Sequence, residues 1–122
     1  MKDYNDVKCN PVEAKSFEFA VRIVKFSKWL KRERKEFEIA NQILRCGTSI
    51  GANIAEAQFA QSKKDFVSKM HIALKEAYEA EYWLRLIVAA KIVLPNEVKS
   101  LKEQLKEILK LLTTIVKTAK HQ

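Results

Sequence analysis

Apolar residues recur every three or four positions through most of this chain, and this spacing constrains the fold more than any other feature. Such spacing lays one apolar stripe along a helix, whereas a half-buried strand alternates at every second residue. The chain has 122 residues with only two glycines and two prolines, so few points interrupt long regular elements. The sequence therefore predicts an all-α protein of one domain, without strands.

The apolar pattern divides into four helical segments joined by short connections. Helices are expected over about residues 12–31, 37–59, 63 to 91 or 93, and 96–119, with the third ending before Pro95. The basic run KRERKE at 31–36 is the expected first turn, and Ser62 with Asp65 resembles a capping box at the second. Short connections make neighbouring helices antiparallel. The expected organisation is a flexible arm at 1–11, an antiparallel up-down-up-down four-helix bundle at 12–119 and a tail at 120–122.

Each predicted helix carries one apolar stripe that should form the core. The expected stripes are Phe19, Ile23, Phe26 and Leu30; Ile39, Ile43, Cys46, Ile50, Asn53 and Ala57; Phe66, Met70, Ala73, Ala77, Ala80, Leu84 and Ile87; and Val98, Leu101, Leu105, Ile108, Leu112, Ile115 and Ala119.

Asn53 is the one polar member of these stripes, and Ser49 and Glu56 stand one turn away on either side. The three residues predict a polar strip beside the core. It is either an internal hydrogen-bonded strip, completed in part by a neighbouring subunit, or a ligand contact.

Both glycines of the chain, Gly47 and Gly51, lie one turn apart inside the second predicted helix. A helical Gly costs about 1 kcal/mol relative to Ala, so a compensating gain is expected. Together with Leu44 the glycines predict a shallow groove that lets another helix approach closely. The small residues Ala73, Ala77 and Ala80 make the third helix the expected partner. A hinge or a ligand groove is the alternative.

The formal net charge of +8 favours anionic partners such as RNA, DNA or an acidic protein surface, although solubility alone would also account for it. The predicted nucleic-acid contact set joins the first helix, the first turn and the start of the third helix, and lysines of the fourth helix could extend it. Lysines at a helix start could bind phosphate, or could simply be solvated. The set is Arg22, Lys25, Lys28, Arg32, Arg34, Lys35, Lys63 and Lys64.

No catalytic, cofactor or metal site is predicted, because the residue types do not occur in the required patterns. The metal-binding Glu-x-x-His pattern of helical bundles is absent. Glu76 and Glu79 are expected on a salt-bridged face, and Cys46 is expected to be a buried thiol without a base. The chain start does not resemble a signal peptide and no segment is expected to cross a membrane, so a cytoplasmic protein is predicted.

Two stretches of the sequence resemble a known family. SIGANIAEAQFAQSKKDF and KMHIALKEAYEAEYWLRLI are similar to the family called four helix bundle protein, also known as the 23S rRNA-intervening-sequence protein family. The resemblance covers about residues 15–118. The chain departs from the common pattern at Gly51, where many members have Pro, at Ala57, where many have Gly, and at Lys75-Glu76, where a Gly-Ser pair is frequent.

The resemblance implies a helical bundle, and most of the family has no established activity. A related branch of this family forms a barrel of five subunits, binds nucleic acid through a basic surface and contacts a reverse transcriptase. By resemblance we expect a homo-oligomer, a pentamer. The sequence shows no aromatic-rich basic motif for reading bases, so we expect it to bind RNA or DNA with little sequence preference. The alternative is a protein-interaction scaffold that recruits a partner enzyme and does not bind nucleic acid.

Overall fold

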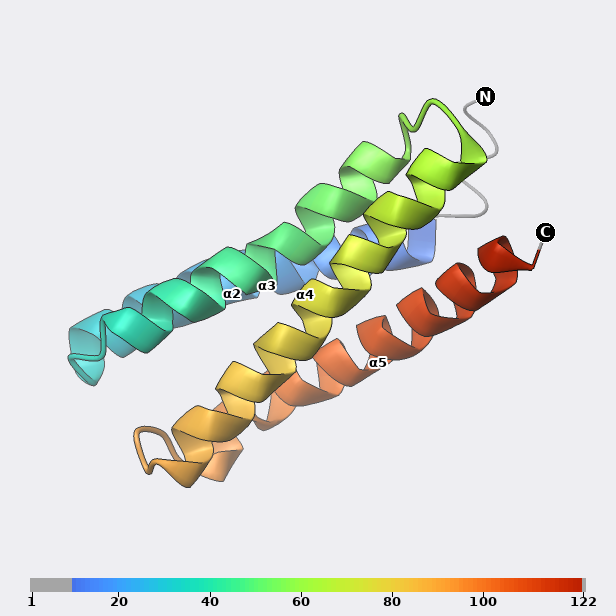
Figure 1. The fold of residues 1–122 in the computed structure, drawn as a ribbon. Helices are drawn as coiled ribbons and strands as arrows, with labels where there is room; N and C mark the ends of the chain where they lie inside the picture. Colours follow the sequence, from blue (N-terminus) through green and yellow to red (C-terminus); the bar gives the residue numbers. More distant parts are fainter. Residues whose placement is uncertain (1–9, 122) are drawn as a thin grey trace.

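The computed structural model describes residues 10–121, and these residues form four helices (Figure 1). The helices are α2 (Asn10–Glu33), α3 (Glu38–Ala57), α4 (Lys63–Ala89) and α5 (Pro95–Lys120). Each helix packs antiparallel against the next along the chain, and α5 closes the bundle against α2 through the least extensive contact. This confirms the predicted all-α, up-down-up-down arrangement.

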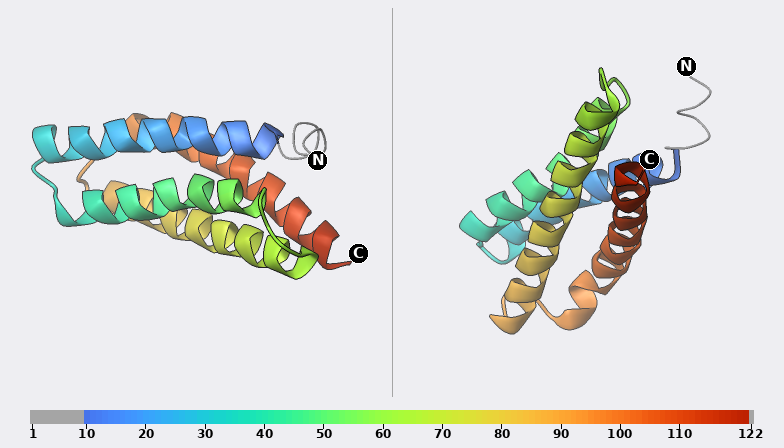
Figure 2. Two further views of the ribbon diagram at one scale, coloured as in Figure 1. Left: turned by 90° about the horizontal axis from the view of Figure 1, so that it is seen from above. Right: turned by 45° about the vertical axis from the view of Figure 1, so that its right-hand side comes forward.

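Different turns and helix ends lie at the two ends of the bundle. One end holds the α2–α3 and α4–α5 turns, and the other holds the start of α2, the α3–α4 turn and the end of α5 (Figure 2). The flexible arm was predicted over residues 1–11, of which 1–9 lie outside the described residues, while Asn10 and Pro11 belong to α2. Within the described part of the chain, no helix is long and apolar enough to cross a membrane.

The helices α2 and α4 are each followed by a lysine in the left-handed conformation, at a position where glycine is the usual residue. Lys35 has φ of 54° and Lys91 has φ of 63°, both in the left-handed region. After Lys35, the Glu36 N–H donates to the Leu30 carbonyl at 3.2 Å, a bond that closes a helix end. The first turn therefore begins at Arg34, three residues later than the start of the KRERKE run.

Core burial confirms most of the predicted stripes and corrects two of them. Ile54 is fully buried in α3, whereas Asn53, predicted for the core, is half-buried. Likewise Val116 is buried in α5 and Ile115 is half-buried. A straight helix repeats at 3.6 residues per turn, so a stripe read at 3.5 drifts away from the core within two or three heptads.

The two glycines do allow close packing, but the partner helix is α2 and not α4 as predicted. A Cβ on Gly47 would lie 2.8 Å from Cγ2 of Ile23, closer than atoms can approach. A Cβ on Gly51 would lie 3.4 Å from the Ser16 carbonyl oxygen. Ser27 on the same side of α2 donates to the Ala40 carbonyl at 3.1 Å. The α2–α3 pair is therefore held at short range along most of its length.

The start of α4 is capped much as predicted. The Ser62 hydroxyl accepts a hydrogen bond from the Asp65 N–H at 3.0 Å. The returning bond of the predicted capping box is displaced by one residue, because the Asp65 carboxylate accepts from the Gln61 N–H at 3.2 Å. Both bonds fix the direction in which the chain enters α4.

Candidate nucleic-acid interface

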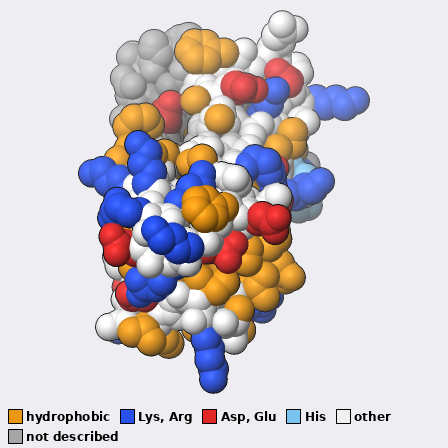
Figure 3. All heavy atoms as spheres, turned by 90° about the vertical axis from the view of Figure 1, so that its left-hand side faces the viewer, with side chains coloured by type: hydrophobic (Ala, Val, Ile, Leu, Met, Phe, Trp, Pro, Cys, Tyr) orange, Lys and Arg blue, Asp and Glu red, His pale blue; other side chains and the backbone are white. Residues whose placement is uncertain are grey.

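Positive charge is unevenly distributed over the four helices. The helices α2 and α5 each carry six basic and three acidic residues, α4 carries five and four, and α3 carries one and two. The end of the bundle with the α2–α3 turn shows basic side chains interspersed with acidic and hydrophobic ones (Figure 3). Whether a basic side chain is paired within the chain or free to bind a ligand therefore depends on its neighbours.

The arginines of the predicted contact set make contacts within the chain. Arg22 donates to Gln104 at 2.7 Å and to Ser100 at 3.1 Å, which joins α2 to α5. Arg32 pairs with Glu33 at 2.8 Å, next to it in sequence. Arg34 pairs with Glu97 of α5 and donates to the Ile92 carbonyl in the α4–α5 turn. Arg22 and Arg34 thus join distant parts of the chain, whereas Arg32 pairs only with its neighbour, and all three guanidinium groups are less available to a ligand.

The lysines of that set divide between the two ends of the molecule. Lys25, Lys28 and Lys35 are exposed and have no ion pair within the described chain. Lys63 and Lys64 begin α4 at the opposite end, about 30 Å away along the length of α3. The structure does not bring them together with Arg34 and Lys35 in one surface.

Lys63 and Lys64 instead share a hollow with the end of α5. Its volume is about 690 Å³, and its charged or titratable lining consists of Lys63, Lys64, His71, Lys75 and Lys120, without an acidic side chain. Val67, Ile72 and Ala119 supply apolar lining. This end of the α4–α5 pair is therefore strongly cationic.

The lysines of α5 continue this surface along the bundle. They recur at helical spacing and lie outside the core, and none has an ion pair among the described residues. The stripe consists of Lys99, Lys102, Lys106, Lys110, Lys117 and Lys120. A second hollow of about 710 Å³ between α5 and α4 is lined by Lys99, Lys102 and Lys106 together with Glu81 and Glu103. We call the exposed surface formed by α4 and α5 the α4–α5 face.

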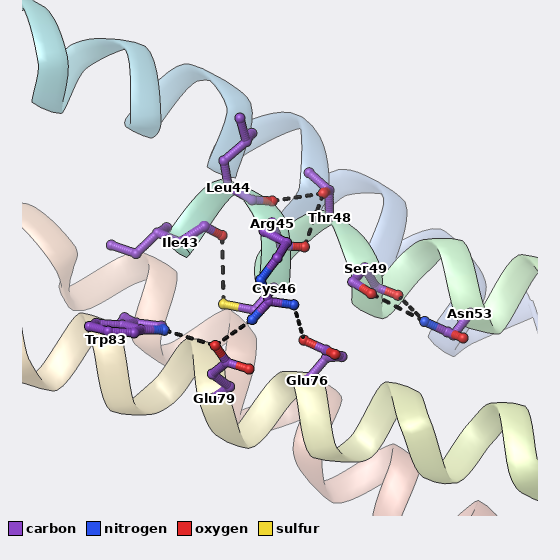
Figure 4. A network of polar contacts seen from close by, with 10 residues as sticks. All are labelled: Ile43, Leu44, Arg45, Cys46, Thr48, Ser49, Asn53, Glu76, Glu79 and Trp83. Carbon is purple, nitrogen blue, oxygen red and sulfur yellow. Dashed lines mark hydrogen bonds and ion pairs between the residues drawn. The ribbon is translucent and has the colours of Figure 1, made fainter. Parts of the chain in front are cut away.

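The α3–α4 side differs, because its charges are paired (Figure 4). Arg45 of α3 pairs with Glu76 at 3.2 Å and with Glu79, and Trp83 donates its indole N–H to Glu79 at 3.1 Å. The hydrogen bond from Arg45, followed by that from Trp83, lowers the pKa of Glu79. The predicted salt-bridged face is confirmed. Burial raises the pKa of the Cys46 thiol to about 12, and the negative charge of Glu79 adds to the effect.

The predicted polar strip forms only in part. The Asn53 amide donates to the Ser49 carbonyl at 2.9 Å and to its hydroxyl at 3.2 Å, within one turn of α3. Glu56 pairs instead with Lys69 of α4 at 2.9 Å. Within residues 10–121, no three His, Cys, Asp or Glu side chains lie close enough to share a metal ion.

Exposed apolar side chains gather on the α2–α3 side. Phe17, Val21 and Val24 of α2 are 70%, 40% and 36% exposed. Beside them lies a hollow of about 610 Å³ whose lining includes Phe17, Gly51 and Ala55. We call this surface the α2–α3 face.

The α4–α5 face also holds an aromatic element that was not predicted from the sequence. Tyr78 and Tyr82 are 55% and 48% exposed and follow His71 and Lys75 along α4 at three- and four-residue steps, before Arg85. This spacing is visible in the sequence. The aromatic element becomes part of a basic surface only because α4 packs beside the lysines of α5, which the spacing within one helix does not show.

Comparisons with known proteins agree with the fold. A family model described as 23S rRNA-intervening sequence protein matches residues 9–114. A crystal structure at 1.70 Å of a protein of unknown function, from the S23 ribosomal protein family of Bacteroides thetaiotaomicron VPI-5482, is 52% identical to this chain. The similarity covers 91% of this chain and 99% of that one, with a TM-score of 0.88. No curated protein matches.

Proposed function

Since this chain belongs to the family of 23S rRNA-intervening sequence proteins, as its sequence motifs predicted, we propose that it is a non-enzymatic, homo-oligomeric protein that binds nucleic acid. The contacts are made to phosphates, with little sequence preference. One observation carries the proposal: the unpaired lysines of the α4–α5 face. Lysine is a point charge that suits phosphate without fixing a base sequence.

The α4–α5 face suits a polyanion in both length and charge. Lys99 and Lys120, the ends of the lysine stripe of α5, are 21 residue steps apart, or about 32 Å of helix. Glu81 and Glu103 line the α4–α5 hollow near the α4–α5 turn, whereas the hollow at the other end has no acidic lining. Lysines without carboxylate partners repel one another, and bound phosphates would relieve that repulsion.

The test is a salt titration of labelled RNA and duplex DNA with protein freed of carried-over nucleic acid. We expect binding that weakens steeply as salt rises, since each phosphate contact contributes a slope of about 0.9 in log K against log salt. The double variant Lys106→Glu/Lys110→Glu should weaken binding and reduce that slope by about 2.

A matched control separates this face from the α2 residues predicted from sequence. Lys25→Glu/Lys28→Glu changes the net charge equally, on a helix that is not part of the α4–α5 face. It should weaken binding less than the α5 variant. A larger effect of the α2 variant would move the site to α2, and no binding at low salt would refute nucleic-acid binding.

We propose the α2–α3 face as the self-association surface. Exposed apolar side chains next to an apolar hollow favour burial against another chain. A ring of five subunits is the arrangement expected from the family resemblance. Sedimentation equilibrium should show an oligomer that Phe17→Ser weakens and Leu94→Ser does not, since Leu94 is 61% exposed at the α4–α5 turn. A monomer at micromolar concentration would contradict self-association.

The same face supports the alternative function, a scaffold that recruits a protein partner such as a reverse transcriptase. An apolar surface left open on a monomer would serve this role. The two functions differ in the titration with RNA and DNA. A scaffold without nucleic-acid binding, whether monomeric or oligomeric, would bind neither, and its partner binding would not depend on the charge of the α5 lysines.

A further inference from the structure

Tyrosines of α4 lie within the cationic surface. Tyr78 follows Lys75 by three residues and precedes Glu81 by three. Lys75 lines the hollow at one end of the α4–α5 pair and Glu81 lines the hollow at the other. Tyr78 therefore lies between the two hollows, and Tyr82 follows it one turn later on the same side of α4.

The helices α4 and α5 pack antiparallel against each other (Figure 1), so the residues that line the same hollow from both helices show which turns lie opposite one another. Lys120 lines a hollow with His71 and Lys75, and Lys106 lines one with Glu81. The turn of α4 with Tyr78 therefore lies opposite the middle of α5, between Lys106 and Lys117. Lysine side chains and exposed aromatic rings therefore belong to the same face of the α4–α5 pair.

Neither tyrosine side chain is buried in the core. Tyr78 is 55% exposed, and Tyr82 is 48% exposed with its ring edge-on to Trp83 at 5.2 Å. The Arg85 guanidinium lies 6.0 Å from the centre of the Tyr82 ring, so a positive charge lies near this ring. Exposed rings cannot reach bases that are stacked inside a duplex, but they can stack on bases of a single strand.

We propose that the α4–α5 face binds single-stranded nucleic acid in preference to duplex, with bases stacking on Tyr78 and Tyr82 while the lysines of α5 contact the phosphates. The inference rests on the proposed nucleic-acid binding and specifies its substrate. Stacking on aromatic rings accepts every base, which agrees with weak sequence preference.

The experiment measures fluorescence anisotropy of one labelled 20-nucleotide strand, alone and annealed to its complement, at fixed salt. The single strand should bind more tightly than the duplex. Tyr78→Leu should weaken single-strand binding about tenfold, since loss of stacking on one base has an effect of that order, and leave duplex binding unchanged. Tyr78→Phe should bind like the original protein, because the ring is kept.

Controls separate the failure of this inference from the failure of nucleic-acid binding itself. Phe37→Leu removes an exposed ring at the α2–α3 turn and should change neither affinity. Lys106→Glu/Lys110→Glu should weaken the binding of both the single strand and the duplex. Equal affinity for single strand and duplex, or Tyr78→Leu binding as tightly as the original, would overturn the single-strand inference alone. No binding of either form would overturn both proposals. Unchanged thermal unfolding of each variant shows that the fold is intact.

Discussion

Arg34 and Glu97 stand 63 positions apart in the chain and form an ion pair of 2.6 Å. The Arg34 guanidinium also lies 4.5 Å from the centre of the Trp29 ring and donates to the Ile92 carbonyl at 3.2 Å. Glu97 accepts in turn from the Leu94 N–H at 2.8 Å. One arginine thus joins both turns at this end of the bundle, and it adds to the contact between α2 and α5, the least extensive of the four helix pairs.

The first prediction concerns this arginine. Arg34→Ala should lower stability by about 1–2 kcal/mol, because it removes the cation–π contact and the packing of the side chain on Trp29. For a domain of this size that is a fall in Tm of about 4–10 °C. Arg32→Ala is the matched control, since Arg32 pairs only with its exposed neighbour Glu33. Equal Tm values for the two variants would contradict the structural role of Arg34.

The second prediction is the pH dependence of the same contact. The pKa of Glu97 lies below its ordinary value of 4.5, first because the Leu94 N–H donates to the carboxylate and further because Arg34 does. A lowered folded pKa stabilises the protein fully above pH 4.5 and less as pH falls through the folded value. Chemical denaturation should therefore show a difference in the free energy of unfolding between the original protein and Glu97→Gln that is constant near neutral pH. This difference should narrow below pH 4.5, and a difference that widens there would contradict the contact.

The third prediction compares the two glycines. Gly47→Ala should destabilise by about 1–3 kcal/mol, since its Cβ would collide with the buried Ile23 side chain and overpack the α2–α3 contact. Gly51→Ala should be neutral or stabilise by up to about 1 kcal/mol, because its nearest contact of 3.4 Å leaves the helix-propensity gain of Ala largely intact. Urea unfolding measures both. A stabilised Gly47→Ala variant would show that α2 and α3 are further apart.

The fourth prediction uses the thiol of Cys46. With a pKa raised to about 12, the thiol is almost wholly protonated at pH 8, and a thiolate is the species that reacts. A thiol reagent should modify Cys46 at least about 1,000-fold more slowly in native protein than in denatured protein, where the pKa returns to its ordinary range. The variant Cys9→Ser leaves Cys46 as the only thiol. Rapid native modification would contradict burial of this side chain.

Local spacing in the sequence predicted the helices, their order and most of their core, because each helix repeats one apolar stripe. It could not predict which helix the glycines face, since Gly47 meets Ile23 only through the packing angle of α2 on α3. The hydrogen bonds of Arg22 and Arg34 could not be predicted either, because the acceptors lie at least 78 positions away from Arg22 and at least 58 positions away from Arg34. The α4–α5 face needed two helices from different parts of the sequence to be placed side by side.

The last prediction tests the corrected core of α3. Ile54→Ala should destabilise by about 2–5 kcal/mol, because it leaves a cavity where a fully buried side chain had been. Asn53→Ala should cost less than about 1 kcal/mol, since the half-buried amide bonds only to Ser49 of its own helix and water can replace those bonds. The stripe read from sequence gives the opposite order, with Asn53 inside. Guanidinium unfolding of both variants, with helix content checked before the transition, distinguishes the two registers. If Asn53→Ala is the more destabilised, α3 is rotated by about 100° from the position described and the 3.5-residue stripe is correct.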